Sequence, residues 1–269
     1  MRNIIICLLM GLSLSAMGQG IIKHDTRAIV KSKGAQAKKS TGAPQNPVAK
    51  LLKDMVRVQG GTYTMGTDNG QANERPAHQA TVASFYICKY EVTQELWRAI
   101  MGPTKFFYKG RNLPATEVNW LQCQLFIQKL NARTGKHFRL PTEEEWEWAA
   151  RGGNRSRGYR YSGSDDCGKV AWYYSTPEER LPHSVGTKKP NELGLYDMSG
   201  NAMEWVSDAY GTYGQASRTY NPDQDKLAVG RGGSFYGSAD QVSVYARDGR
   251  RAKDKWMDDM GLRLAASAL

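Results

Sequence analysis

The chain has little cysteine, little histidine and few long apolar runs. Its 269 residues include four cysteines and four histidines. The histidines, His24, His78, His137 and His183, are scattered without metal-ligand spacing, which argues against a histidine-based iron centre. One apolar run, Ile4 to Leu14, is too short to span a bilayer of roughly 30 Å as a helix. No fixed-period repeat is found, so a repeat architecture is not expected.

The N-terminus has the pattern of an export signal. A basic residue, Arg2, precedes the apolar run, and small residues follow it up to Gly18. We therefore predict a signal peptide over residues 1–18 and an exported mature chain that is periplasmic, at the cell surface or secreted, with no transmembrane segment. Three cysteines would remain, Cys88, Cys123 and Cys167. Cys88 and Cys123 are expected in the core; one disulfide is possible, and the sequence does not choose its pair.

Positive charge is concentrated near the N-terminus. The first fifty residues hold eight basic side chains and one acidic side chain, which gives +7 of the formal +11. Residues 19–50 are otherwise small and polar, so we predict a disordered basic linker there. The folded part, residues 51–269, is only mildly basic, and this argues against a nucleic-acid partner.

The folded part is long enough for one large domain. We predict a hairpin from strands 55–58 and 60–66, then a strand over 81–90. Three helices are predicted by their caps. Thr93 caps a helix that ends near Met101, Asn119 caps a second that stops by Gly135, and Thr142 with Glu145 forms a capping box for a third. Regular structure is expected to thin out from 154 to 227 and to return as strands at 229–236, 242–247 and 261–265.

The segment Gly194–Asp208 is a candidate cation-binding loop. It places two carboxylates, Asp197 and Glu204, on either side of Gly200 and Asn201 in a stretch that is too irregular for a helix or strand. Carboxylate and carbonyl oxygens from one folded-back loop are the ligands that calcium prefers. The alternative is that these carboxylates cap turns or pair with a nearby arginine.

The order of the motifs resembles that of the formylglycine-generating enzyme, or sulfatase-modifying factor, family. The blocks that carry the resemblance span nearly all of residues 51–269: Gly60 to Gly66, Tyr90 to Thr93, Val118 to Trp120, Arg139 to Glu143, Gly194 to Trp205, Arg231 to Phe235 and Gly261 to Leu264. The resemblance implies a single α+β domain with C-type-lectin-like topology and much irregular structure. It also implies structural calcium, held by the side chains of Asp197 and Glu204 and the carbonyls of Gly200 and Ala202.

The resemblance does not extend to the catalytic thiols. The enzyme of the family oxidises a sulfatase cysteine through two copper-binding cysteines, which lie just after the Gly-Gly-Ser-Phe block. Those positions are Gly237 and Val242 here. Copper-dependent oxidation is therefore not expected, because a soft sulfur pair is what holds Cu(I).

The leading hypothesis is a calcium-stabilised, non-catalytic binding or assembly module for a protein or glycan ligand. The ligand is expected at a C-terminal face whose candidate residues are Tyr236, Asp240, Tyr245, Arg247, Arg250, Trp256 and Asp258. One alternative is a sulfatase-modifying oxidoreductase, for formylglycine generation or non-haem iron chemistry, with an atypical site. Another is a C-type-lectin-like display protein with a diversified C-terminal face. A solvated loop with Tyr245 and Trp256 in the core is the structural alternative.

Overall fold

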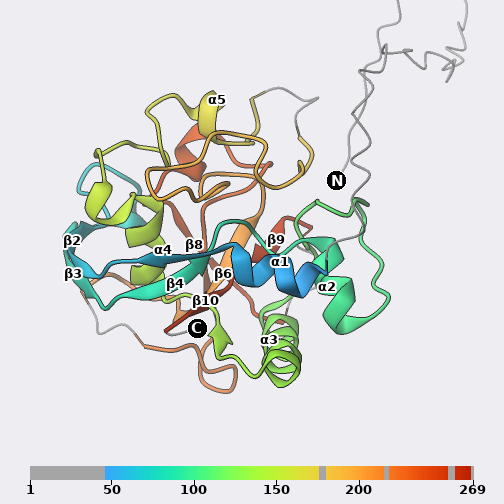
Figure 1. Ribbon diagram of the computed structural model, residues 1–269. Helices are drawn as coiled ribbons and strands as arrows, with labels where there is room; N and C mark the ends of the chain where they lie inside the picture. The colour runs from blue at the N-terminus through green and yellow to red at the C-terminus, as the bar shows by residue number, and fades with distance from the viewer. Residues whose placement is uncertain (1–45, 176–179, 215–217, 254–257, 268–269) are drawn as a thin grey trace, which may run out of the picture. The chain divides into compact units, whose positions relative to one another are not determined.

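The computed structural model describes residues 46–175, 180–214, 218–253 and 258–267 (Figure 1). The predicted signal peptide and most of the predicted linker lie outside these ranges. The fold begins earlier than the predicted boundary at residue 51. Helix α1 (Pro47–Lys53) is capped by the Asn46 side chain, and its Val48 and Leu51 are buried. Across the described ranges, no helix combines the length and the apolarity needed to cross a membrane.

The described strands form two four-stranded sheets and one two-stranded sheet. The first sheet is antiparallel and has the order β1 (Met55–Val58), β4 (Phe85–Cys88), β10 (Ala265–Ala266), β5 (Phe138–Arg139). The two-stranded sheet pairs β2 (Gly61–Met65) with β3 (His78–Val82). The remaining sheet has the order β8 (Arg247–Arg250), β7 (Ala228–Arg231), β6 (Met203–Ala209), β9 (Met260–Leu262), with β6 and β9 parallel.

The predicted opening hairpin is wrong. β1 and β2 follow each other along the chain, but β1 pairs with β4 and β2 pairs with β3. The predicted strand 81–90 is accordingly divided, because β3 ends at Val82 and β4 starts at Phe85. Gly60 permits the crossing between sheets, since a Cβ there would lie 2.4 Å from the carbonyl oxygen of Val82.

The three capped helices are confirmed. Thr93 caps α2 (Gln94–Met101), Asn119 caps α3 (Trp120–Thr134), and Thr142 with Glu145 closes a capping box on α4 (Glu143–Ala150). A short helix, α5 (Cys167–Val170), and the 3-10 turns Ala72–Glu74, Gly153–Arg155 and Ala239–Val242 complete the described helices.

Three predictions about the second half of the chain differ from the structure. The segment from 194 to 208 is not irregular throughout, because Met203–Ala209 forms β6 inside the third sheet. The strand predicted over 242–247 starts only at its last residue; β8 is Arg247–Arg250, and a 3-10 turn over Ala239–Val242 precedes it. The strand predicted over 229–236 ends at Arg231, where two glycines turn the chain.

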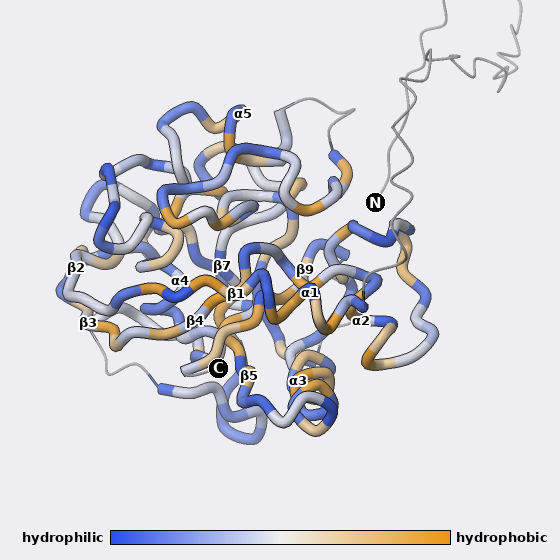
Figure 2. Tube along the Cα trace, in the orientation of Figure 1, coloured by the Kyte–Doolittle hydropathy of each residue, from blue (hydrophilic) through white to orange (hydrophobic). Residues whose placement is uncertain are grey.

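The buried apolar residues form two large clusters and a small one. One large cluster joins α1, α2 and α3 to the third sheet, and the other gathers around Trp146 and Trp148 of α4. Figure 2 shows hydrophobic residues along α1 and α3. Cys88, Cys123 and Cys167 are buried free thiols, which agrees with core positions for Cys88 and Cys123. The molecule is therefore an α+β domain, as predicted, with α4 beside the elements that carry the site below.

Candidate functional site

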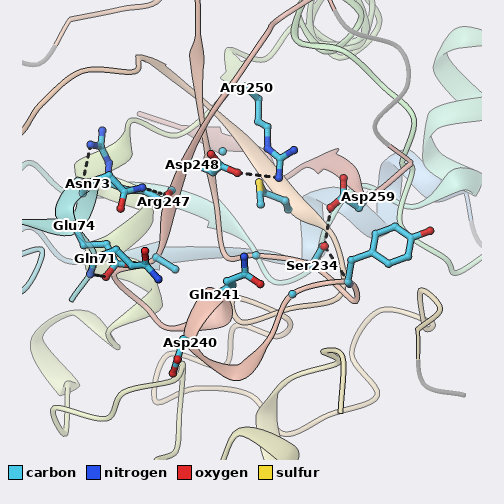
Figure 3. Close-up of a pocket in the computed structure, with 16 residues that line it drawn as sticks. Gln71, Asn73, Glu74, Ser234, Asp240, Gln241, Arg247, Asp248, Arg250 and Asp259 are labelled. Atoms are coloured by element: carbon cyan, nitrogen blue, oxygen red, sulfur yellow. Dashed lines mark hydrogen bonds and ion pairs between the residues drawn. The ribbon is translucent and has the colours of Figure 1, made fainter. Parts of the chain in front are cut away.

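A polar cavity of about 290 Å³ opens where the second half of the chain meets the 3-10 turn Ala72–Glu74 (Figure 3). Its wall consists of Gln71, Asn73 and Glu74 on one side, residues of β8 on another, and the segment from Ser234 to Gln241 on a third. Asp259 also lines the cavity, and Met203, Gly230 and Ala246 supply apolar surface. Eight of the sixteen lining residues lie between Tyr236 and Asp258, the segment in which the sequence predicted a ligand face.

A glycine turn shapes one wall of the cavity. Gly232 and Gly233 have φ values of 88° and 63°, which side chains other than glycine rarely adopt. A Cβ on Gly233 would lie 2.1 Å from the carbonyl oxygen of Gln241. The close approach brings the 3-10 turn Ala239–Val242 against the chain leaving β7, and so places Asp240 and Gln241 at the cavity.

Buried ion pairs from α4 hold the other wall. Glu147 accepts hydrogen bonds from Arg231 and from Nε of Arg151, the latter at 2.8 Å. Glu143 accepts two from Arg247, at 2.6 and 2.8 Å. Burial of these paired charges is favourable only because each has several partners, and breaking one would leave the other uncompensated. In α4, Glu145 closes the predicted capping box, whereas Glu143 and Glu147 hold ion pairs that the sequence did not predict.

Arg247 also connects two walls of the cavity, because it hydrogen-bonds with Asn73, which lies 174 residues earlier in the sequence. Its Nη1 donates to the carbonyl of Asn73 at 3.1 Å, and the Asn73 side chain donates to the carbonyl of Arg247 at 2.7 Å. The 3-10 turn Ala72–Glu74 is thereby fixed beside β8. Arg247 thus builds the cavity, and its guanidinium is already committed to Glu143.

Two buried carboxyls lie in the cavity. Asp259 accepts a hydrogen bond from the Ser234 hydroxyl at 2.7 Å, and Glu74 accepts one from the backbone of Gln71 at 2.7 Å. Burial raises the pKa of both carboxyls. A serine beside an aspartate lacks the base that activates a serine nucleophile, because the described lining residues include no histidine, lysine or cysteine.

The structure brings together four of the seven predicted ligand residues, namely Tyr236, Asp240, Arg247 and Arg250. Asp258 lies beside them and accepts a hydrogen bond from the Tyr236 hydroxyl at 2.6 Å. Tyr245 packs against the core cluster around Trp146 instead, as the structural alternative proposed, and Trp256 lies outside the described residues. Gln71, Asn73 and Glu74 were missed, since no local pattern relates them to a segment so distant in sequence.

The predicted calcium segment is only partly free to bind a cation. Glu204 accepts hydrogen bonds from Trp146 at 2.6 Å and from two nitrogens of Arg263, at 2.6 and 3.0 Å. Pairing with an arginine, the alternative considered for this carboxylate, is therefore present. Asp197 differs, because Oδ2 accepts from Gly186 at 2.6 Å while the buried Oδ1 has no hydrogen-bond partner.

The charges around Asp197 favour a cation. Three buried carboxyl groups repel one another here, those of Glu91, Asp197 and Glu204. The buried guanidinium of Arg263 offsets part of their charge. Burial raises the pKa of Asp197 to about 6, and burial together with the Asp197 charge raises that of Glu91. Among the residues described, no three acidic, cysteine or histidine side chains form a metal cluster. Asp197 fits calcium because its buried Oδ1 has no hydrogen-bond partner. Glu204 fits only if it shares its carboxylate with Arg263. Calcium binding stays a prediction.

The two positions where the resemblance would place copper cysteines, Gly237 and Val242, differ in their relation to the cavity. Gly237 lines it, and Val242 is fully buried in the neighbouring 3-10 turn. The three described thiols lie elsewhere in the fold. Burial raises the pKa of Cys88 to about 11 and that of Cys167 to about 12, so both are protonated at neutral pH.

Comparison with known proteins identifies relatives of this fold. A family model described as "Sulfatase-modifying factor enzyme 1-like domain" matches residues 39–268. The chain is 29% identical to the chaperone protein LppX of Paenibacillus barcinonensis, over 80% of this chain and 89% of that protein. It is 26% identical to the formylglycine-generating enzyme of Mus musculus, over 88% of this chain and 81% of the enzyme.

Two further similarities bear on the site. The inactive C-alpha-formylglycine-generating enzyme 2 of Mus musculus is 27% identical, over 80% of this chain and 86% of that protein. Among solved structures, Treponema denticola variable protein 1 superposes with a TM-score of 0.70 at 29% identity, over 79% of this chain and 94% of the other. The expected fold is thus confirmed.

Proposed function

Because the chain belongs to the family of sulfatase-modifying factor enzyme 1-like domains, we propose that it is a binding or assembly module with the cavity of Figure 3 as its ligand site. The observation that carries the proposal is the nature of the cavity. Its wall is rich in carboxylates and amides, it is held by buried ion pairs, and it has no thiol at Gly237 or Val242. Such a wall suits recognition by hydrogen bonds and charge.

Catalysis by the chemistry of the enzyme is disfavoured at this site. A glycine and a buried valine supply no ligand for Cu(I), which prefers thiolates. The described cysteines are buried away from the cavity, and their raised pKa values oppose thiolate formation. Two relatives support a non-catalytic role by name, since one is called a chaperone and another is called inactive.

Two further properties belong to this proposal. We propose that calcium stabilises the loop around Asp197, whose unpartnered buried oxygen it would satisfy. We also propose that the protein is exported, on the signal pattern of residues 1–18.

The binding role is tested with arrays that present peptides on one half and glycans on the other. The site variant is Asp248→Ala with Arg250→Ala, which removes two interacting side chains from the cavity together. The matched control is Glu95→Ala with Arg111→Ala, an exposed ion pair outside this cavity. Ligands that bind the wild type and the control but not the site variant support the proposal. Equal binding by all three proteins would contradict it.

The oxidoreductase alternative is tested in the same preparation. The domain is mixed with a cysteine peptide of a sulfatase, copper and oxygen, and the peptide is analysed by mass spectrometry. We expect no aldehyde. Turnover to formylglycine would assign catalysis to groups other than Gly237 and Val242.

A further inference from the structure

The lining of the cavity has more acidic than basic groups. Four carboxylates, Glu74, Asp240, Asp248 and Asp259, face two guanidinium groups, Arg247 and Arg250. Arg247 is bound through two nitrogens to Glu143, which does not line the cavity. Asp240 in turn pairs with Arg160, which also lies outside the lining. Within the lining the carboxylates outnumber the guanidinium groups by four to two. A ligand that brings a positive charge would complete the balance.

The four carboxylates, labelled in Figure 3, differ in exposure. Asp240 and Asp248 are at the accessible edge, with side chains 71% and 48% exposed, and they pair with Arg160 at 2.5 Å and Arg250 at 2.9 Å. Asp259 and Glu74 are buried within the wall. A carboxylate accepts up to about four hydrogen bonds, so these contacts leave acceptor capacity in both the exposed and the buried pair. A cationic head group can thus be attracted at the edge and bound further in.

One part of the lining suits an aliphatic stem. Met203, Gly230, Gly233 and Ala246 are buried residues of the lining, and none carries a polar side-chain group. A volume of about 290 Å³ is near the lower end of ligand cavities, which hold small ligands rather than extended chains. Lysine and arginine combine a stem that packs on apolar surface with a charged head. One such side chain matches both parts of the cavity.

Aromatic residues adjoin the cavity through Tyr236; Phe107 and Tyr174 are exposed, and Tyr108 and Tyr236 are half-buried. The Tyr236 hydroxyl contacts that of Tyr108 at 3.1 Å, and Tyr108 packs edge-on against Phe107, which is 72% exposed. Arg180 lies over the rings of both Tyr236 and Tyr174, at 4.8 and 5.3 Å. We call Phe107, Tyr108, Tyr174 and Tyr236 the aromatic surface. Aromatic and arginine side chains of this kind are enriched where proteins bind one another.

We infer that the cavity binds a lysine or arginine side chain of a polypeptide partner, and that the aromatic surface contacts the partner residues beside it. The inference rests on the proposed binding function and names its ligand class. The charge of the lining decides between ligands, because sulfated or acidic glycans and phosphates would meet four carboxylates. A neutral glycan would leave the negative charge unbalanced.

The cationic part is tested with Nα-acetyl-lysine amide and its uncharged counterpart Nα-acetyl-norleucine amide, using isothermal titration. We expect the lysine compound to bind and the norleucine compound to bind at least about tenfold more weakly, since a charge-assisted hydrogen bond contributes on this scale. Asp248→Asn should weaken lysine binding by a similar factor. Asp223→Asn removes the same charge from an exposed position outside the cavity and should have no effect.

The polypeptide part is tested with an acetylated Gly-Tyr-Lys-Tyr-Gly amide. It should bind about tenfold more tightly than the single lysine, and Phe107→Ala should remove that gain without changing binding of the lysine compound. Equal binding of lysine and norleucine, or no loss in Asp248→Asn, would overturn the inference. If the arrays above show a cavity-dependent glycan ligand instead, this inference fails while the binding function stands. If nothing binds through the cavity, both fail.

Discussion

At the scale of single residues, the glycine turn before Ser234 has a geometric requirement that a variant can measure. Gly233 has φ 63° and a close approach to the carbonyl of Gln241, whereas Gly135, at the end of α3, has φ 65° and nothing within 4 Å of an added Cβ. An alanine at Gly135 would therefore report backbone strain alone, whereas an alanine at Gly233 would report backbone strain together with a steric contact.

Gly233→Ala should destabilise the domain more than Gly135→Ala. The left-handed backbone costs alanine about 1–2 kcal/mol at either position. At Gly233 the contact with Gln241 adds roughly 1–3 kcal/mol. Urea unfolding of the two variants beside the wild type measures the difference. Equal losses would show that the turn relaxes and that the contact with Gln241 does not constrain the cavity wall.

Asp197 offers the sharpest test of calcium. At a free calcium concentration a hundredfold above its Kd, calcium binding stabilises the folded state by about 2.7 kcal/mol. Chelation should then lower Tm by on the order of 5–10 °C. Asp197→Asn should abolish that dependence and keep the hydrogen bond from Gly186. Magnesium should substitute poorly, because it demands a tighter six-oxygen shell.

Glu204 would be a poor choice for the same test. Its removal would strand Arg263 and the Trp146 indole in the core, so a loss of stability would follow with or without calcium. A melting curve of the wild-type domain that is identical in calcium and in chelator would contradict calcium binding directly.

The sequence predicted residues more reliably where the signal was local. The caps Thr93, Asn119 and Thr142 each act on a helix within three residues, and all three were found. The partner of Glu204 could not be chosen in advance, because several arginines were available and Arg263 lies 59 residues away. Asp248 and Asp259, within or just after the predicted ligand face, could have been included by composition alone.

At the scale of elements, α4 anchors the cavity through charge. Glu147 is fully buried, and its carboxylate accepts hydrogen bonds from Arg231, from Arg151 and from the backbone N–H of Gly66. Arg231 is itself fully buried and donates to the carbonyls of Tyr245 and Ala246, so it holds the chain that leads to β8. The helix thus stabilises a site that it does not line.

Glu147→Gln should destabilise the domain by about 3–5 kcal/mol, because it leaves the Arg231 charge buried without its carboxylate. Glu144→Gln, in the same helix, is the matched control. Burial and the Asp208 charge raise the pKa of Glu144, so neutralising it should be neutral or slightly stabilising. Thermal unfolding measures both. A loss under 1 kcal/mol in Glu147→Gln would mean that Arg231 finds other partners.

The elements that the sequence misplaced are those whose neighbours lie far along the chain. β1 and β2 have alternating patterns and a glycine link, which are typical of a hairpin, yet each pairs with a strand that follows later. β6 was missed because Met203–Ala209 is buried almost throughout and therefore lacks the alternation of a half-exposed strand. Sheet order depends on tertiary contacts, which local patterns do not encode.

At the scale of the whole molecule, charge is unevenly divided. Most of the net +11 lies in the first fifty residues, while the cavity is acidic. From the signal pattern we expect the mature protein to begin near Gln19 and to be found outside the cytoplasm. Mass spectrometry of fractionated cells tests this. A cytoplasmic pool that retains Met1 would contradict export.

Binding and stability should respond to pH in opposite directions. Burial raises the pKa of Asp259 and of Glu74, so both carboxyls take up protons at a higher pH in the folded state than in the unfolded chain. Their protonation therefore stabilises the folded state as the pH falls through their folded pKa values toward the ordinary carboxyl range near 4. The same protonation removes negative charge from the cavity, so binding of Nα-acetyl-lysine amide should weaken over that interval.

Asp259→Asn separates this effect from other titrations. The asparagine at position 259 carries no charge at any pH. The variant should therefore bind the lysine compound weakly at neutral pH, and its affinity should decline less steeply on acidification. The wild type should lose affinity at a pH above that at which an exposed carboxylate would titrate, because the folded pKa of Asp259 is raised. Titration calorimetry across the range, with unfolding measured in parallel, records both quantities. Affinity that rises on acidification would show that the bound form of the cavity is protonated, which is incompatible with recognition of a cation by these carboxylates.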